Sequence, residues 1–353
     1  MADSEIMLIF AATFLLHASM ISEIRLKNYG PVGEAVCSDL AKINVLIGHN
    51  GSGKTFLLKS LYSALKTIEQ YKRGKEPRSA KELLAEALYW TFQTESLGSL
   101  VKKANSTLSY SMSSSKDEVF EYSFGGSTTK GIQNLTNTFS PTNVNNIFIP
   151  AKEIVSIQDI ILRAFEVDKQ FGFDKSYVDL SRALSKTLQG RNVKEFADAR
   201  KSLTDTIGGK LEYDDDRKAW VFKDNNKHVF EINVTSEGIK RLSILDLLLG
   251  NHYLSRHSVV IIDEAEANLH PEMISRFMDI LVTLAKSGLQ VFISTHSYFV
   301  IKNLYILAHQ QNISIPTYSF ESGRVVRSDL KTEMPDNPII NESINIYRKE
   351  ISL

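Results

Sequence analysis

One segment constrains this chain more than any other: a glycine-rich loop set between an apolar run and a helical pattern. Residues 43–47 have the apolar character of a buried strand, residues 48–55 read GHNGSGKT, and residues 56–65 carry apolar side chains at helical spacing. The loop matches G-x-x-x-x-G-K-[ST] in full, and the flanks supply the strand and the helix that this motif requires. The sequence therefore predicts a strand–loop–helix unit of the kind found in parallel α/β sheets.

The residue types of this loop point to a phosphate ligand. Its glycines let backbone N–H groups approach phosphate oxygens, and the start of the following helix adds a favourable dipole. We expect Lys54 to neutralise the β- and γ-phosphates of ATP and Thr55 to bind Mg²⁺. A chance glycine-rich turn is the alternative, and the flanking elements disfavour it. The residues expected to bind ATP are His49, Asn50, Gly51, Ser52, Gly53, Lys54, Thr55 and Phe56.

A second apolar strand, at residues 259–262, ends in two acids. Two carboxylates at the end of a buried strand are costly without a partner, and a Mg²⁺ held near Thr55 would supply one. We expect Asp263 to bind that metal and Glu264 to act as the catalytic base that polarises the attacking water. An ordinary strand followed by an acidic turn is the alternative.

Composition excludes several classes of protein. The 353 residues carry 41 basic and 41 acidic side chains, which argues against a wholly basic nucleic-acid binder. The hydrophobic fraction of 43% and the charged fraction of 23% exclude disorder and a multi-span membrane protein. A single cysteine, Cys37, rules out an internal disulfide framework and a cysteine-rich metal site. It fits a reducing compartment, and we expect a cytoplasmic protein.

Strands alternate with helices over the C-terminal third, which predicts an α/β fold with a mainly parallel sheet and flanking helices. We expect an ATPase core formed by residues 21–73 and 207–330, with an N-terminal antiparallel β portion. Residues 74–206 are expected to form an inserted α/β lid and helical region, with strands at 106–115 and 119–124. Residues 331–353 are expected to form a C-terminal tail.

The first 20 residues have an uncertain status. An apolar run extends from Ile6 to Ile21, which is short for a bilayer span, and Asp3 and Glu5 precede it where a secretory signal would be basic. We interpret residues 1–20 as an over-read start or a terminal extension. A membrane-contacting or partner-binding helix and a cleaved signal are the alternatives, and we expect no membrane partner.

Three further segments resemble those of ABC-type ATPases. Residues 235–240, TSEGIK, lie where this family carries its Leu-Ser-Gly-Gly-Gln signature, and they match it at Ser236 and Gly238 only. Residues 263–271, DEAEANLHP, resemble the Asp-Glu-Pro-Glu…Leu-His-Pro segment of the Old-like and RecF/SMC-like ATPases, with Ala265 in place of proline. Residues 294–297, STHS, resemble the switch-histidine loop. The chain is thus identified as a P-loop NTPase of the ABC-ATPase type.

The resemblance implies a mechanism in which two heads dimerise with ATP between them. Ser236, with Glu237 and Gly238, would contact the γ-phosphate bound by the opposite subunit. Asn268, Leu269 and His270 would form the D-loop at the dimer seam. His296 would act as a catalytic residue on the γ-phosphate held by its own subunit. An ordinary helix cap is the alternative for Ser236, and a structural histidine is the alternative for His296.

Two features of such ATPases stay open in this sequence. The strand ending at residues 149–153 is where a glutamine loop is expected, but the nearest glutamine is Gln158. Tyr29 follows the first strand and would either stack on adenine or serve as a turn aromatic.

The same resemblance implies a role. Because 56 residues follow Ser297, we expect no Toprim nuclease domain of the kind that Old-family nucleases carry there. The chain looks like the compact ATPase components of anti-phage defence systems such as PARIS and Septu, in which a separate effector, often a nuclease, is controlled by the ATPase. We therefore expect a slow or trigger-dependent ATPase that regulates an effector.

Three rival functions are considered. A RecF/SMC-like ATPase of DNA repair would need a DNA-contacting surface, and a basic stretch in the insertion would supply it unless it is a solvated face. The nucleotide-binding subunit of a membrane transporter and a nucleotide-gated scaffold are the other two. The basic stretch comprises Lys72, Arg73, Lys75, Arg78 and Lys81, with Lys102 and Lys103 beyond it.

Overall fold

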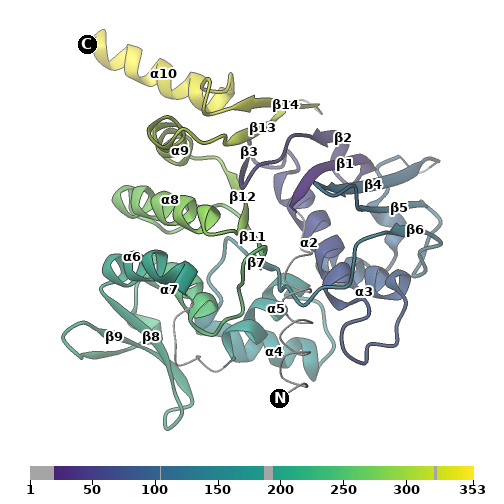
Figure 1. Cartoon of the computed structure of the whole chain (residues 1–353), viewed down its shortest axis with the longest axis horizontal. Coiled ribbons are helices and arrows are strands. Elements are labelled where there is room, and N and C mark those ends of the chain that lie inside the picture. The colour runs from purple at the N-terminus through teal and green to yellow at the C-terminus, as the bar shows by residue number, and fades with distance from the viewer. Residues whose placement is uncertain (1–19, 104, 187–193, 322–323) are drawn as a thin grey trace, which may run out of the picture.

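The computed structural model describes residues 20–103, 105–186, 194–321 and 324–353. The apolar extension expected at residues 1–20 lies outside the described residues except for Met20. Two sheets with one helix between them form the body of the molecule, and further helices cover the far side of the larger sheet (Figure 1).

The larger sheet has six strands in the order β14-β13-β3-β12-β11-β7. All neighbours are parallel except β13 and β14. Because the strands are parallel, the carboxyl ends of β3, β12 and β11 meet at one edge of the sheet. Its strands are β3 (Ile43–Gly48), β7 (Ile147–Ile149), β11 (Val259–Ile262), β12 (Gln290–Thr295), β13 (Pro316–Glu321) and β14 (Arg324–Asp329).

The second sheet is antiparallel and has five strands in the order β2-β1-β4-β5-β6. It confirms the antiparallel N-terminal portion. The strand predicted at 106–115 pairs with β1 and the strand predicted at 119–124 pairs with β4, so both belong to the same sheet as β1. Leu108, Tyr110 and Met112 of β4 are buried in the same cluster as Ile24 and Leu26 of β1. The strands are β1 (Ile21–Tyr29), β2 (Val32–Cys37), β4 (Thr107–Ser114), β5 (Val119–Gly125) and β6 (Asn134–Asn137).

Helix α2 (Lys54–Gln70) packs between the two sheets, and α3 (Ala80–Phe92) packs against it. Successive side chains of each parallel strand point to opposite faces of the sheet and pack into two cores. Val45 and Ile47 of β3 face one cluster, while Leu46 faces the cluster that contains α2. Helices α7, α8 and α9 cover the face opposite to α2 (Figure 1). The sheet therefore fixes the start of α2 at the edge where β3 ends.

The remaining elements surround this body. A third sheet is a three-stranded meander in the order β10-β9-β8, and α10 lies beside α9 (Figure 1). The helices are α4 (Gln158–Glu166), α5 (Lys175–Leu184), α6 (Ala197–Ile207), α7 (Glu237–Gly250), α8 (Pro271–Lys286), α9 (Tyr298–Gln311) and α10 (Pro338–Ile351). The meander strands are β8 (Gly209–Asp214), β9 (Ala219–Asp224) and β10 (Val229–Glu231). Short 3₁₀ turns occupy Leu97–Leu100, Val155–Ile157, Lys194–Phe196 and Ile232–Val234.

Candidate functional site

The glycine-rich loop connects β3 to α2 at the carboxyl edge of the six-stranded sheet. Gly53, the residue before α2, has a φ of 104°, and a Cβ there would lie 2.7 Å from Val32 Cγ2. Gly48 has a φ of 150°, and a Cβ there would lie 2.8 Å from the Phe320 carbonyl oxygen. Both positions exclude side chains, so the loop's conformation depends on glycine at these two places.

Lys54 begins α2 and its ammonium group stays within the loop. Its Nζ donates to the carbonyl oxygens of Gly48, at 2.7 Å, and His49, at 3.0 Å. Burial lowers the pKa of Lys54, while three nearby carboxylates act in the opposite direction. A buried ammonium among backbone carbonyls is a suitable partner for a polyphosphate.

Thr55 and Asp263 meet across the edge of the sheet. The Thr55 hydroxyl donates to both carboxylate oxygens of Asp263, at 2.9 and 3.1 Å, and Ser294 Oγ donates to the same carboxylate at 2.5 Å. Hydroxyl and carboxylate oxygens are ligands that Mg²⁺ prefers. Among the described residues no group of three or more His, Cys, Asp or Glu side chains could hold a metal by itself. The pair thus fits a Mg²⁺ that takes its other ligands from phosphates and water.

Glu264 follows Asp263 in a left-handed conformation, with a φ of 48°. This conformation is uncommon for a residue with a side chain and clusters at functional sites. Its amide donates to Ser294 Oγ at 2.9 Å, and its side chain lines the cleft beside Lys54 and Thr55. The turn therefore directs Glu264 into the same cleft as the loop.

Arg241, which the sequence reasoning did not single out, holds the backbone of this acidic turn. Its guanidinium donates to the carbonyl oxygens of Asp263 and Glu264, at 2.7 and 2.8 Å. It also donates to the carbonyls of Pro150 and Ala151, at 3.0 and 2.9 Å. Burial lowers the pKa of Arg241 to about 10. An arginine on α7 thus joins the ends of β7 and β11, and no local motif signals it.

The acidic turn is also attached to the end of β12. The Ala265 amide donates to the Ser294 carbonyl at 3.2 Å. Proline, which related segments carry at this position, has no amide hydrogen and could not make this bond. His296 comes directly after β12, and its amide donates to Glu266 at 2.9 Å. His296 does not line the cleft around Lys54.

The cleft has a volume of about 380 Å³ and an aromatic wall. Phe56 at the start of α2 and Phe92 at the end of α3 have ring centroids 4.6 Å apart, and both line the cleft with Pro31. The possibility that Tyr29 stacks on adenine is wrong: its ring is fully buried under Phe56, and its hydroxyl bonds to Tyr122 at 2.9 Å. The turn after β1 directs Tyr29 into the protein interior. Phe92, which no sequence motif signals, lines the cleft instead.

The signature segment lies outside this cleft. Ser236 caps α7, and its hydroxyl accepts from the Ile239 amide at 3.4 Å. Gly238 packs on the 268–270 turn, since a Cβ there would lie 2.9 Å from the Asn268 carbonyl oxygen. His270 caps α8 by accepting from the Glu272 amide. None of these residues lines the cleft around Lys54.

Gln158 does not serve as a cleft glutamine. Its side chain is buried between three elements, donating to the Ser181 carbonyl and to Ser185 Oγ, and accepting from Trp220 Nε1 at 2.5 Å. It holds α4, α5 and β9 together.

The basic stretch is partly neutralised. Arg73 pairs with Glu69 at 3.2 Å, and Arg78 pairs with Glu76 at 2.7 Å and also with Glu86. These pairs reduce the positive field that a DNA backbone would meet at this surface.

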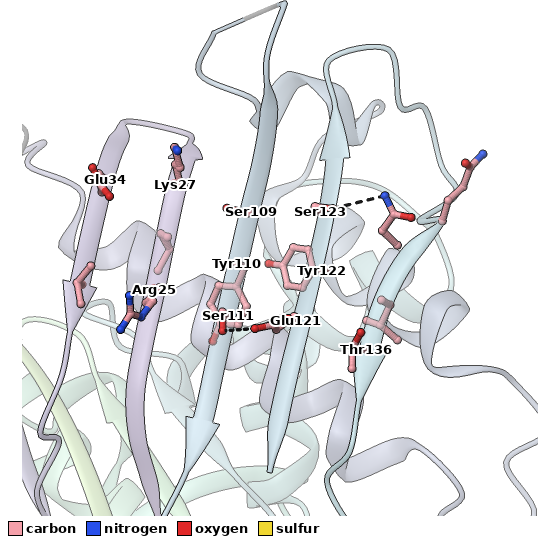
Figure 2. Close-up of a pocket in the computed structure, with 15 residues that line it drawn as sticks. Arg25, Lys27, Glu34, Ser109, Tyr110, Ser111, Glu121, Tyr122, Ser123 and Thr136 are labelled. Carbon is pink, nitrogen blue, oxygen red and sulfur yellow. Dashed lines mark hydrogen bonds between the residues drawn. The ribbon is translucent and has the colours of Figure 1, made fainter. Parts of the chain in front are cut away.

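A larger hollow, of about 610 Å³, lies on the outer face of the five-stranded sheet (Figure 2). Its lining includes three serines and one threonine, the Ser111 hydroxyl donates to Glu121 at 2.9 Å, and Arg25 pairs with Glu23. None of the predicted site residues lines this hollow. We therefore assign the candidate site to the smaller cleft at the glycine-rich loop.

Comparisons with known proteins identify a family and a fold. The AAA_21 family, described as "AAA domain, putative AbiEii toxin, Type IV TA system", matches residues 43–302. A search of curated proteins found no match. The structure is similar to an Smc head bound to the C-winged helix domain of ScpA, at 15% identity, with 89% of this chain and 98% of that chain covered and a TM-score of 0.54.

A second similar structure is an Smc head domain with an extended coiled coil bound to the C-terminal domain of ScpA, from Pyrococcus furiosus. It has 15% identity, covers 92% of this chain and 99% of that chain, and gives a TM-score of 0.51. At these identities the likeness shows the fold, which is that of an ABC-type ATPase head. Within the described parts of the chain, no helix combines the length and the apolar character that a membrane span requires.

Proposed function

The chain belongs to the AAA_21 family, and from this membership we propose that it binds and hydrolyses ATP with Mg²⁺. The observation that carries the proposal is the pairing of Thr55 Oγ1 with the Asp263 carboxylate beside Lys54 and Glu264. Lys54, Thr55 and Glu264, from two motifs more than 200 residues apart in sequence, thus line one cleft, and Asp263 is joined to it through its bonds to Thr55.

Each residue has a distinct task in this proposal. Backbone N–H groups of residues 50–55 bind the β- and γ-phosphates, and Lys54 neutralises their charge. Thr55 and Asp263 hold the Mg²⁺, which when bound offsets negative charge on the phosphates. Glu264 orients a water molecule for attack on the γ-phosphorus and accepts its proton. Ser294 keeps Asp263 and the Glu264 amide in place.

We further propose that hydrolysis requires two copies. Ser236 and Gly238 do not line the cleft of their own chain, and Ser236 presents the start of a 14-residue helix. A helix start binds anions well, so a second copy's γ-phosphate is the ligand that suits it. His296 would reach the γ-phosphate from its own side once the two heads close.

The role we propose is regulation of a separate effector, such as a nuclease, in anti-phage defence. Support comes from the family description, which names a toxin of a type IV toxin–antitoxin system. A RecF/SMC-like association with DNA is the rival. It has the less support because Arg73 and Arg78 in the basic stretch are already paired with acids.

Glu264→Gln tests whether Glu264 is the catalytic base. Because the amide cannot accept the water's proton, we expect hydrolysis to fall by ~100-fold or more while ATP binding persists. Turnover is measured by phosphate release, and affinity by titration with a fluorescent ATP analogue. Glu272→Gln is the matched control, since the side chain of Glu272 is exposed and pairs with Arg276 on the surface of α8. Wild-type turnover by Glu264→Gln would show that Glu264 is not the base.

The same variant, purified from its native host with Mg-ATP, tests the role. Mass spectrometry of the purified complex should identify a stoichiometric effector that Lys54→Ala protein does not retain. Recovery of DNA and repair factors without such an effector would instead support the DNA-associated function.

A further inference from the structure

Glu266 lies two residues beyond the proposed base and makes contacts that no motif assigns to it. Its carboxylate accepts from Thr295 Oγ1 at 2.8 Å and from the His296 amide at 2.9 Å. The His296 ring nitrogen Nδ1 lies 3.4 Å from the same carboxylate. Its backbone carbonyl accepts from the Leu269 amide at 3.0 Å, at the start of the 268–270 turn. One residue thus joins the switch loop and the expected D-loop.

We propose that Glu266 is a positioning residue that fixes the orientation and the tautomer of His296. The inference rests on the proposed function, in which His296 meets the γ-phosphate. Glu266 itself does not line the cleft, so its effect on the reaction passes through the histidine.

The chemistry of the carboxylate supports this role. An ionised carboxylate only accepts hydrogen bonds, and here a hydroxyl and a backbone amide donate to it while the imidazole Nδ1 lies 3.4 Å away. A carboxylate beside Nδ1 selects the tautomer that carries hydrogen on that nitrogen. Nε2 is then the nitrogen available to another ligand. Within the described parts of the chain, no other acid pairs with the His296 ring.

The burial of the two side chains separates their tasks. The side chain of Glu266 is 11% exposed, whereas that of His296 is 44% exposed. The acid is therefore held in the body of the protein, and the histidine extends from it toward solvent. Thr295 is fully buried, so its bond to Glu266 anchors the carboxylate at the end of β12.

Glu266→Gln is the decisive variant, because the amide keeps the shape but brings an NH₂ group toward groups that already donate. We expect kcat for ATP to fall by about 10-fold, with KM changed by less than about twofold, because an interaction realised only in the transition state is lost. The same substitution in a His296→Ala background should cause no further loss. Glu272→Gln is the control. An equal loss in both backgrounds would overturn the proposal and leave Glu266 a purely structural residue.

A second measurement does not depend on hydrolysis. Imidazole ¹⁵N NMR, with the His296 signals identified by their loss in His296→Ala, should show hydrogen on Nδ1 in the parent protein. In Glu266→Gln the two tautomers should become mixed. An unchanged tautomer in Glu266→Gln would overturn the proposal even if the protein proved inactive toward ATP. The parent protein could instead prove to have no ATPase activity while Glu266→Gln still shifts the tautomer. That result would support the positioning contact and overturn only the proposed function.

Discussion

The proposed phosphate-binding cleft and the signature segment were both predicted from short motifs, but a single chain builds them to different degrees. In the cleft, Thr55 and Asp263 bond directly, and Lys54 and Glu264 line the same space. In the signature segment, the Ser236 hydroxyl accepts from its own helix, at Ile239. Contacts within the chain thus hold the residues of the cleft together, whereas the signature segment resembles an ordinary helix cap.

This difference teaches how to read motifs in a single chain. Residues whose partners lie in the same chain acquire hydrogen bonds that reveal them. A residue whose proposed ligand belongs to a second copy shows only the local bonds of its helix. Substitutions that affect ATP binding by one chain separately from the assembly of two chains test this comparison.

Lys54→Ala should have the largest effect on the cleft. It removes the buried ammonium that the loop carbonyls hold, and charge-assisted contacts are worth about 1.5–3 kcal/mol each. We expect the Kd for ATP to rise by ~100-fold, measured by titration with a fluorescent ATP analogue. Lys81→Ala, on the exposed surface of α3, should bind ATP like the parent. If Lys54→Ala bound ATP as tightly as the parent, the cleft would not be the nucleotide site.

Ser236→Asp should separate the cap from the proposed contact across two copies. Asp caps a helix as well as Ser, so the melting temperature should stay within about 2 °C of the parent. The added charge would repel a γ-phosphate, and ATP-dependent assembly of the Glu264→Gln protein should weaken by about 10-fold. Light scattering at increasing ATP concentrations measures this assembly.

Ser236→Ala is the complementary variant. It removes the cap, which costs about 1 kcal/mol of stability, but adds no charge. Assembly that is as strong in Ser236→Asp as in the parent would mean that Ser236 is a cap and nothing more. Assembly that fails only in Ser236→Asp would place the helix start against a phosphate.

The carboxyl edge of the sheet could be predicted from sequence because both of its motifs are local. Residues 48–55 and 259–264 each follow an apolar strand, and parallel strands bring their carboxyl ends to one edge. The bond between Thr55 and Asp263 follows from that topology. Two strands of the five-stranded sheet were predicted at 106–115 and 119–124, but the pairing of β4 with β1 was not, because pairing between distant segments leaves no local sequence pattern.

The contacts made by tertiary packing could not be predicted. Arg241 reaches the acidic turn only because α7 packs behind β11, and no spacing rule connects an arginine to four carbonyl oxygens. Phe92 enters the cleft because α3 packs on α2. Tyr29, in contrast, lies outside the cleft because the turn after β1 buries it against Phe56 and Tyr122.

Phe92→Ala should have the smallest effect and tests the aromatic wall. Stacking of a base on an aromatic ring is worth about 1–3 kcal/mol, and Phe56 remains in place. We expect ATP and ADP to bind about 5-fold more weakly, while inorganic tripolyphosphate, which has no base, competes as it does with the parent. Phe230→Ala, at an exposed position on β10, is the control. An equal loss for tripolyphosphate would mean that Phe92 supports the loop, and that the base binds elsewhere.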